Sequence, residues 1–196
     1  MTKTAERVNI VDTQVLSHDW YLLQKITFDY LRNNGDWQRQ TREVYDRGNG
    51  AAILLFNRDK RTVVLTRQFR LPVFVNGHDG LLIEVAAGLL EGAAPEQRIR
   101  DEAEEETGYR VHEVKKVFEA YMSPGSVTEK LHFFIAEYDA KSKVSEGGGL
   151  EEETEELEVL EWGFDEALAA FHRGEICDAK TIMLLQYAAM NNLFDS

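Results

Sequence analysis

Short runs rich in aromatic and β-branched residues dominate the N-terminal quarter of the chain, and such runs are typical of β-strands. Residues 20–30 form one of them, the turn signal Asn-Asn-Gly-Asp follows at 33–36, and residues 37–45 form the next. An isolated hairpin of this size is only marginally stable in water. We therefore expect it to pair with the main body of the protein or with another subunit.

The rest of the chain mixes strand and helix patterns. We expect strands at 51–56, 62–70, 81–85, 114–121, 131–138 and 157–162, helices at 95–107, 165–172 and 180–190, and loops at 71–80, 122–129 and 145–156. Asp178 is the expected N-cap of the last helix, and the acidic, glycine-rich loop at 145–156 is expected to be mobile. Strands with one helix after the third of them and another towards the end fit an α+β sandwich.

The stretch 87–108 carries the main functional signal. Pro95 suits the first turn of a helix, and Gly108 suits the left-handed position just past its end. Between them Glu102, Glu105 and Glu106 stand at i, i+3 and i+4, so their carboxylates share one helix face. A solvated face is the usual fate of such a charge run. Carboxylates on a rigid face are also what hard cations such as Mg²⁺ prefer.

Composition narrows the function classes. The formal net charge of −13 argues against a nucleic-acid partner, because phosphate backbones attract basic surfaces. It also means that an anionic substrate would need metal ions and well-placed Arg or Lys residues. No apolar run reaches the length of a membrane helix, and the N-terminus has no apolar signal core, so we expect no membrane partner. The single cysteine, Cys177, permits no internal disulfide and favours a reducing cytoplasm.

The stretch around the glutamates resembles the Nudix box, G-x5-E-x7-R-E-U-x-E-E-x-G-U, in which U is apolar. The second half of the box is matched by Glu102, Ala103, Glu105, Glu106, Gly108 and Tyr109. This resemblance shifts the preferred interpretation of the acidic face from a solvated surface to a metal site.

The first half of the box departs from the pattern. The box glycine falls on Ala87, its first glutamate on Ala93 and its arginine on Asp101. That glutamate and arginine are similar to an ion pair that braces the box in many family members, and here both are absent. Loss of both partners leaves no unpaired charge behind. Arg98 and Arg100 are the candidates to brace the turn in another way.

The likeness runs over nearly the whole chain. Together with the box, the segments DRGNG, RQFR, YMSPG and DAKT resemble the GDP-mannose pyrophosphatase branch of the Nudix hydrolases, close to the ADP-ribose pyrophosphatases. The resemblance implies an α/β/α Nudix sandwich with a mixed central sheet at 49–196. It also implies a small antiparallel β unit at 1–48, exchanged in a homodimer. The implied reaction is Mg²⁺-dependent cleavage of GDP-mannose to GMP and mannose 1-phosphate, with Mn²⁺ as a substitute metal.

The resemblance also assigns roles to individual positions. Glu102 and Glu106 match the metal-binding glutamates, together with the backbone carbonyl of Ala87. Glu105, Glu106 and the loop acid Glu129 are the candidates for catalysis. The matching substrate contacts, some of them from the partner subunit, are Trp20, Thr41, Arg42, Glu43, Arg70, Gly88, Glu129, Glu152, Glu153 and Lys180.

Three alternatives stay open. The nearest is an ADP-ribose or ADP-sugar pyrophosphatase with the same machinery, because the choice of nucleobase rests on few contacts. The others are a non-catalytic Nudix-fold sensor of nucleotide sugars and a purely structural dimerisation protein. The intact glutamate cluster argues against both of these, since binding alone needs no metal-activated water. Within the acidic loop, Glu152, Glu153 and Glu155 all remain candidates for a substrate contact.

Overall fold

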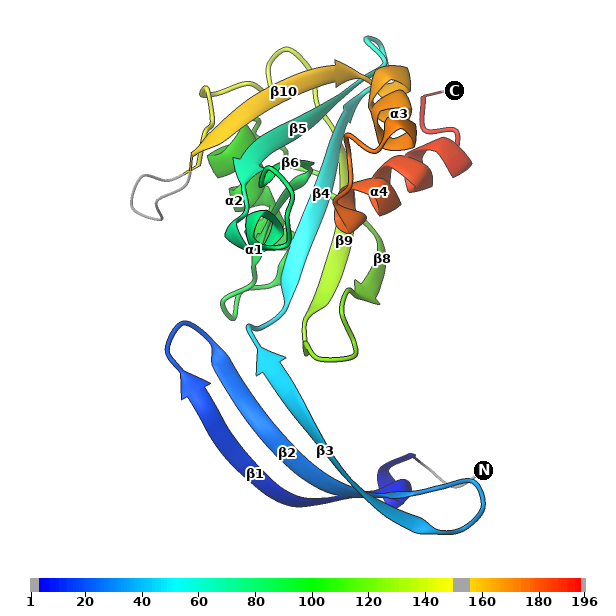
Figure 1. The fold of residues 1–196 in the computed structure, drawn as a ribbon. Helices are drawn as coiled ribbons and strands as arrows, with labels where there is room; N and C mark the ends of the chain where they lie inside the picture. Colours follow the sequence, from blue (N-terminus) through cyan, green and yellow to red (C-terminus); the bar gives the residue numbers. More distant parts are fainter. Residues whose placement is uncertain (1–3, 150–155, 195–196) are drawn as a thin grey trace. The chain divides into compact units, whose positions relative to one another are not determined.

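The computed structural model describes residues 4–149 and 156–194 (Figure 1). These residues divide into two units. The first unit comprises the chain up to Asn49 together with Tyr121–Lys130, and the second comprises Gly50–Ala120 and the chain from Leu131 onwards. The structure therefore groups the Ser-Pro-Gly loop with the N-terminal strands.

The first unit is built on an antiparallel sheet. After a 3-10 turn, η1 (Thr4–Arg7), its described residues form three strands in the order β1 (Val8–His18), β2 (Leu22–Leu31) and β3 (Trp37–Asp46). β2 and β3 are the predicted hairpin, which makes the expectation of two strands incomplete. β1 was not predicted because its link to β2 lacks the Asn-Gly signal that marks the β2–β3 turn.

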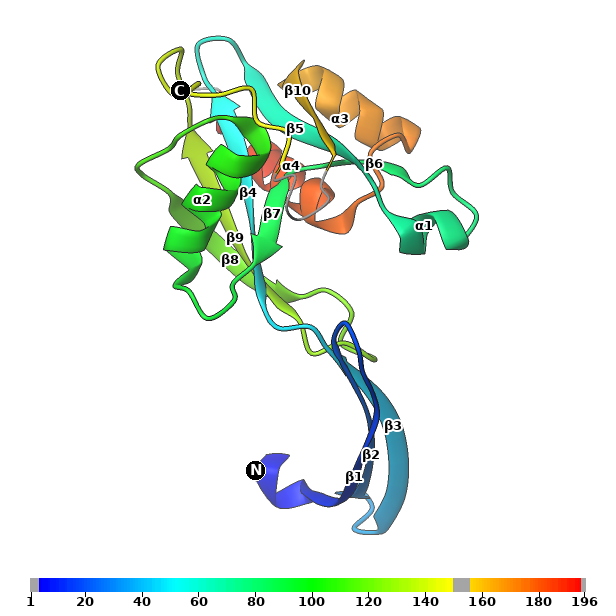
Figure 2. The same cartoon turned by 90° about the vertical axis from the view of Figure 1, so that its left-hand side faces the viewer.

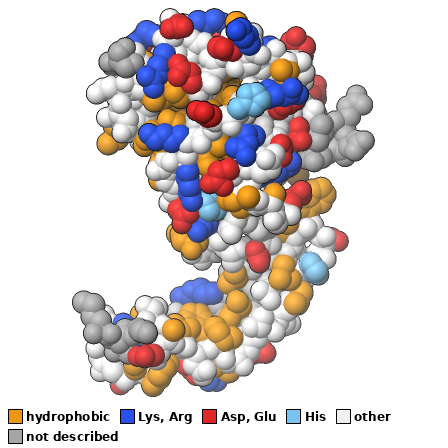
Figure 3. All heavy atoms as spheres, turned by 180° about the vertical axis from the view of Figure 1, so that it is seen from behind, with side chains coloured by type: hydrophobic (Ala, Val, Ile, Leu, Met, Phe, Trp, Pro, Cys, Tyr) orange, Lys and Arg blue, Asp and Glu red, His pale blue; other side chains and the backbone are white. Residues whose placement is uncertain are grey.

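The sheet of the first unit exposes apolar side chains to solvent. Among the described residues, none in β1, β2 or β3 is buried. Figure 3 shows hydrophobic side chains on the surface of this unit. A groove of about 490 Å³ is lined by Val8, Ile10, Ile26, Phe28, Arg42, Val44, Tyr121 and residues 124–128. A contiguous apolar surface of this kind is typical of an interaction site.

The segment Tyr121–Lys130 is held against the end of β3. The Tyr45 amide donates to the Ser126 carbonyl at 2.8 Å, and the Thr128 amide donates to the Tyr45 carbonyl at 3.1 Å. The Thr128 hydroxyl donates to the Asp46 carboxylate at 2.8 Å and so lowers the pKa of Asp46. These bonds fix the loop that precedes Glu129.

The second unit is built on a mixed sheet with β4 at its centre. In the described residues seven strands take part, in the order β10-β5-β4-β9-β8, with β6 beside β5 and β7 beside β4. β4 runs parallel to β9 and antiparallel to β5 and β7. The strands are β4 Gly50–Asn57, β5 Thr62–Phe69, β6 Leu81–Glu84, β7 Ala86–Leu89, β8 Lys115–Tyr121, β9 Lys130–Glu137 and β10 Leu157–Gly163.

Helices cover both faces of this sheet (Figure 2). α2 (Pro95–Thr107) packs on one face against β4, β5 and β7, while α3 (Phe164–Arg173) and α4 (Ala179–Met190) pack on the other. β4 is buried along its whole length, as expected for a strand covered on both sides. The predicted α/β/α sandwich is confirmed. Among the described residues, no helix is long and apolar enough to span a membrane.

Two local expectations were wrong. Residues 71–80 were expected to form a loop but begin with a short helix, α1 (Leu71–Val75), where Pro72 occupies the first helical turn. Residues 86–89 were left out of the expected strands but form β7, which pairs with β4. The turn into α2 follows at Glu91 and Gly92, both of which have positive φ. Ala87 and Gly88 are thus fixed by a sheet.

The C-terminal end of α2 is closed by Gly108, as predicted. Gly108 has φ 76°, and its amide donates to the Glu104 carbonyl at 2.9 Å. The described start of the acidic loop is bonded to the same helix end: the Gly148 amide donates to the Glu106 carbonyl and the Gly149 amide to the Glu105 carbonyl. Residues 148 and 149 are therefore bonded to the end of α2, and the mobility expected of the 145–156 loop stays a prediction.

Candidate active site

Helix α2 presents the predicted glutamates on a buried face. Pro95 starts the helix, and the apolar residues Ile99 and Ala103 anchor it on the sheet, with both side chains fully buried. The neighbouring positions Glu102 and Glu106 are consequently drawn inwards and are only 5% and 3% exposed. Buried carboxylates are costly unless they are paired or coordinate a metal ion.

The backbone of β7 lies directly against these carboxylates. The Ala87 amide donates to the Glu106 carboxylate at 3.2 Å. A Cβ atom added to Gly88 would lie 1.6 Å from Oε1 of Glu102, so any other residue at this position would force that carboxylate to move. The structure thus brings together four of the sequence-predicted positions, Ala87, Gly88, Glu102 and Glu106.

Of the two arginines proposed to brace the turn in place of the family's ion pair, Arg98 makes the contacts that this requires. Its Nη2 lies 2.6 Å from Glu102 Oε1, its Nη1 lies 3.4 Å from Glu105 Oε2, and its Nε donates to the Leu89 carbonyl at 3.2 Å. The other candidate, Arg100, donates to the Gln97 side chain at 3.3 Å. Arg98 therefore connects the acidic face of α2 to the end of β7.

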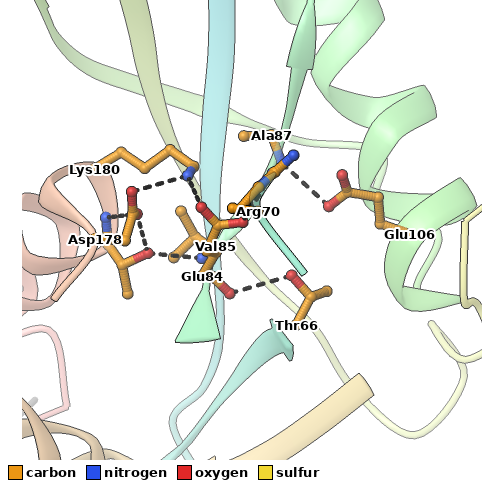
Figure 4. A network of polar contacts seen from close by, with 9 residues as sticks. Thr66, Arg70, Glu84, Val85, Ala87, Glu106, Asp178 and Lys180 are labelled. Carbon is orange, nitrogen blue, oxygen red and sulfur yellow. Dashed lines mark hydrogen bonds and ion pairs between the residues drawn. The ribbon is translucent and has the colours of Figure 1, made fainter. Parts of the chain in front are cut away.

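A second charged network lies beside the carboxylates (Figure 4). Glu84, at the end of β6 and 3% exposed, accepts from Arg70 Nε at 2.9 Å and from Lys180 Nζ at 2.7 Å. Lys180 Nζ also lies 3.0 Å from the Asp178 carboxylate. Two predicted substrate contacts, Arg70 and Lys180, are therefore held by one buried carboxylate. In Figure 4, Arg70 lies beside Ala87 and Glu106.

The carboxylates of this network keep both cations charged. Burial alone would lower the pKa of the Lys180 ammonium, but Glu84 and Asp178 outweigh burial and raise it above its ordinary value of 10.5. Burial likewise opposes the charge of Arg70, and Glu84 outweighs it, with Glu106 and Asp178 adding to the rise in the pKa of Arg70. Both side chains are therefore positive at neutral pH.

The start of α4 is locked to the strands by a threonine. The predicted N-cap Asp178 accepts from the Thr181 amide at 2.9 Å and from the Thr181 hydroxyl at 2.6 Å. The same hydroxyl accepts from the Val85 amide at 2.8 Å. This link positions Lys180 over Glu84. Thr181 was not among the predicted site residues, because nothing in the sequence reveals a bond to a backbone amide 96 positions away.

The remaining predicted residues lie in the first unit or outside the described residues. Trp20 is 84% exposed, and Glu129 lies 3.5 Å from Arg47 with most of its side chain buried. Three further predicted contacts are exposed on β3, namely Thr41, Arg42 and Glu43. Three acids of the 150–155 segment lie outside the described residues, namely Glu152, Glu153 and Glu155.

The donor set of α2 fits a divalent metal ion. Glu102 and Glu106 supply hard oxygen ligands one helical turn apart, beside the backbone of Ala87. Within the described ranges, no three His, Cys, Asp or Glu side chains are gathered as a ready cation site. Glu102 is instead turned to Arg98, and Glu106 to the Ala87 amide. Two carboxylates with several waters or phosphate oxygens are a common magnesium ligand set.

Comparisons with known proteins show the family of the chain. A family model described as the NUDIX domain matches residues 46–184, and one described as the GDP-mannose pyrophosphatase NudK N-terminal domain matches residues 7–45. The GDP-mannose pyrophosphatase of Pectobacterium atrosepticum is 56% identical over 95% of this chain and 96% of its own. That of Cronobacter sakazakii is 54% identical over 96% and 98%, and that of Salmonella typhimurium is 53% identical over 97% and 100%.

A solved structure supports the fold. The crystal structure of an ADP compounds hydrolase matches with a TM-score of 0.72 at 14% sequence identity, covering 94% of this chain and 96% of that one. The α/β/α sandwich, helix α2 with its Nudix box residues and the family model together define the class of the protein. It is a Nudix pyrophosphatase, which is a hydrolase. The chain belongs to the Nudix hydrolases, in the family of the GDP-mannose pyrophosphatases. Nudix hydrolases generally use divalent metal ions such as Mg²⁺.

Replacing Lys180 by Met tests the buried network. The change leaves Glu84 and Asp178 without their shared cation, so we expect the free energy of unfolding at pH 7 to fall by about 3 kcal/mol. Lys116→Met, which removes an exposed pair with Glu119, should cost at most about 1 kcal/mol. Because the folded pKa of Lys180 is raised, its contribution should be complete below its ordinary pKa of 10.5 and be lost only as pH rises through the folded pKa. Urea unfolding of both variants measures this, and equal losses would contradict the network.

Proposed function

We infer that the protein hydrolyses the pyrophosphate bond of a nucleotide sugar, in the first place GDP-mannose, to GMP and mannose 1-phosphate. The observation that carries this is the placement of two kinds of group around the 84–88 backbone (Figure 4). The buried carboxylates of α2 lie on one side, Glu84 and Lys180 lie on the other, and Arg70 lies beside Ala87. A pyrophosphate diester needs both kinds of group, because its oxygens repel an incoming nucleophile.

The carboxylates define the metal side of the reaction. Glu102, Glu106 and the Ala87 carbonyl are the proposed ligands, and Mg²⁺ is the proposed ion, with Mn²⁺ as a substitute. A divalent ion there supplies neutralisation of phosphate charge and activation of the attacking water. Glu105, which is more exposed than its two neighbours, is a candidate to handle the proton of that water. The loop acid Glu129 is the other candidate.

The cations define the phosphate side. The Arg70 guanidinium has a planar fork that suits a phosphate oxygen pair, and Lys180 acts as a point charge. Glu84 holds both in place, so their positions are set before substrate arrives. Fixed donors cost no reorganisation when charge develops in the transition state, which is where such groups contribute most.

The sugar and base contacts are proposed from the family. The relatives that share more than half of their residues with this chain over nearly their full length are GDP-mannose pyrophosphatases. Trp20 is placed beside the base, and Thr41, Arg42 and Glu43 are further substrate contacts, as are Gly88 and the acids Glu152 and Glu153. A cytoplasmic location fits both a nucleotide-sugar substrate and the free, exposed Cys177.

A homodimer completes this proposal. We divide the chain into the β unit at 1–48 and the hydrolase domain at 49–196, with the β unit exchanged between two copies. The groove lined by Ile10, Ile26 and Phe28 supports the proposal, because a three-stranded sheet with no buried residue needs a covering surface. Substrate contacts from β3 of the partner subunit then follow from the exchange.

Glu106→Gln tests the metal side. The amide keeps the size of the side chain but loses its charge, so kcat for GDP-mannose with Mg²⁺ should fall at least about 100-fold, while the melting temperature stays near that of the wild type. The matched control is Glu104→Gln on the same helix, which removes an exposed pair with Arg110 and should leave kcat unchanged. A Glu106→Gln protein that keeps most of its kcat would overturn the assignment.

Ile10→Asp tests the dimer. Ile10 lines the groove, and a buried, unpaired carboxylate in an interface would be costly, so light scattering after gel filtration should show monomers. Gln14→Glu is the control on the same strand, because Gln14 pairs with Lys25, the neighbour of Ile26, and both therefore project from the opposite face. It should stay dimeric. A wild-type protein that is monomeric at micromolar concentration would contradict the proposal.

A further inference from the structure

The acidic face of α2 is compensated from within the helix. Glu102, Glu105 and Glu106 bring three carboxylates onto one face, and two of them are almost fully buried. Like charges in such a setting repel strongly, because the low dielectric of the interior screens them poorly. The face therefore needs positive charge even before any metal ion arrives.

Arg98 has the geometry to supply that charge. Its guanidinium reaches two of the three carboxylates, Glu102 at 2.6 Å and Glu105 at 3.4 Å. Its side chain is only 18% exposed, so solvent screens these pairs weakly. The third arm donates to the Leu89 carbonyl, which fixes the guanidinium between helix and strand.

The position of Arg98 is set by helical spacing. It precedes Glu102 by four residues, and side chains four apart are neighbours on a helix surface. The box positions at which the family pattern has an ion pair carry Ala93 and Asp101 here, so this chain lacks the family's arginine at its usual place. A single cation one helical turn before the first metal-binding glutamate takes over the bracing in this chain.

We propose that Arg98 is an internal counter-cation of the metal site: it neutralises Glu102 and Glu105 in the metal-free protein and competes with the divalent ion for them. The inference rests on the metal site of the proposed function. It makes Arg98 a positioning residue rather than a catalytic one. A metal ion that binds the Glu102 oxygen that Arg98 now contacts must displace Arg98 or share that oxygen with it, so on this proposal Arg98 stabilises the metal-free state at the expense of metal affinity.

The proposal predicts opposite effects on stability and on metal binding. In EDTA, Arg98→Ala should lower the melting temperature by about 5 °C, because two carboxylates lose their partner. The same variant should bind Mn²⁺, followed by electron paramagnetic resonance, at least about threefold more tightly than the wild type. Arg98→Lys keeps the charge but loses the fork, so its Mn²⁺ affinity should return towards the wild-type value.

Arg100→Ala is the matched control, since Arg100 lies on the same helix and bonds to Gln97. It should change neither quantity. If Arg98 had only a structural role, Arg98→Ala would lower the melting temperature but leave Mn²⁺ affinity unchanged or weaker. An unchanged or a weaker Mn²⁺ affinity would therefore overturn the proposal. An Arg98→Ala protein as stable in EDTA as Arg100→Ala would overturn it too.

A second arm separates this proposal from the proposed function. In EDTA, the loss of melting temperature caused by Arg98→Ala should be smaller when Glu105 is already Gln, because less negative charge then remains to be neutralised. An undiminished loss would contradict the counter-cation role without reference to any metal. A wild-type protein that binds no Mn²⁺ would instead overturn both the metal site and the competition that Arg98 is proposed to exert there.

Discussion

Buried carboxylates must be compensated by positive charge, and this constraint organises the second unit. Glu84, Glu102 and Glu106 are all almost inaccessible to solvent. Glu84 is held by Arg70 and Lys180, Glu102 by Arg98, and Glu106 by the backbone amide of Ala87. Removing one partner of a buried pair costs far more than an exposed pair contributes.

The balance of charge differs between the Glu84 network and the acidic face of α2. At Glu84 two cations meet one carboxylate, and Lys180 also pairs with Asp178. On α2 the balance is reversed, because Arg98 contacts two carboxylates, those of Glu102 and Glu105, while Glu106 lies on the same helix face. A divalent ion is what such an excess of buried negative charge attracts. In Figure 4, Glu106 lies on one side of Ala87 and the network of Glu84, Lys180 and Asp178 lies on the other.

Local rules predicted much of this from sequence. Pro95, Gly108 and Asp178 mark helix ends through backbone geometry and capping, and the structure places all three as expected. The face shared by Glu102 and Glu106 follows from helical spacing alone. Contacts between distant segments could not be predicted this way, because the bond from the Val85 amide to Thr181 depends on how α4 packs. Strand β1 was missed for a different reason, namely that no turn signal separates it from β2. The choice of Arg98 over Arg100 was likewise decided by tertiary packing, since only Arg98 faces the end of β7.

The central claim is that this charge arrangement serves a metal-dependent nucleotide-sugar pyrophosphatase that prefers GDP-mannose. The most direct measurement is phosphate release, through a coupled phosphatase, from GDP-mannose and ADP-ribose side by side, with Mg²⁺ and with EDTA. We expect Mg²⁺-dependent phosphate release with a higher kcat/KM for GDP-mannose than for ADP-ribose. In EDTA we expect no release from either substrate. A higher kcat/KM for ADP-ribose would contradict the substrate assignment, and release that persists in EDTA would contradict the metal site on α2.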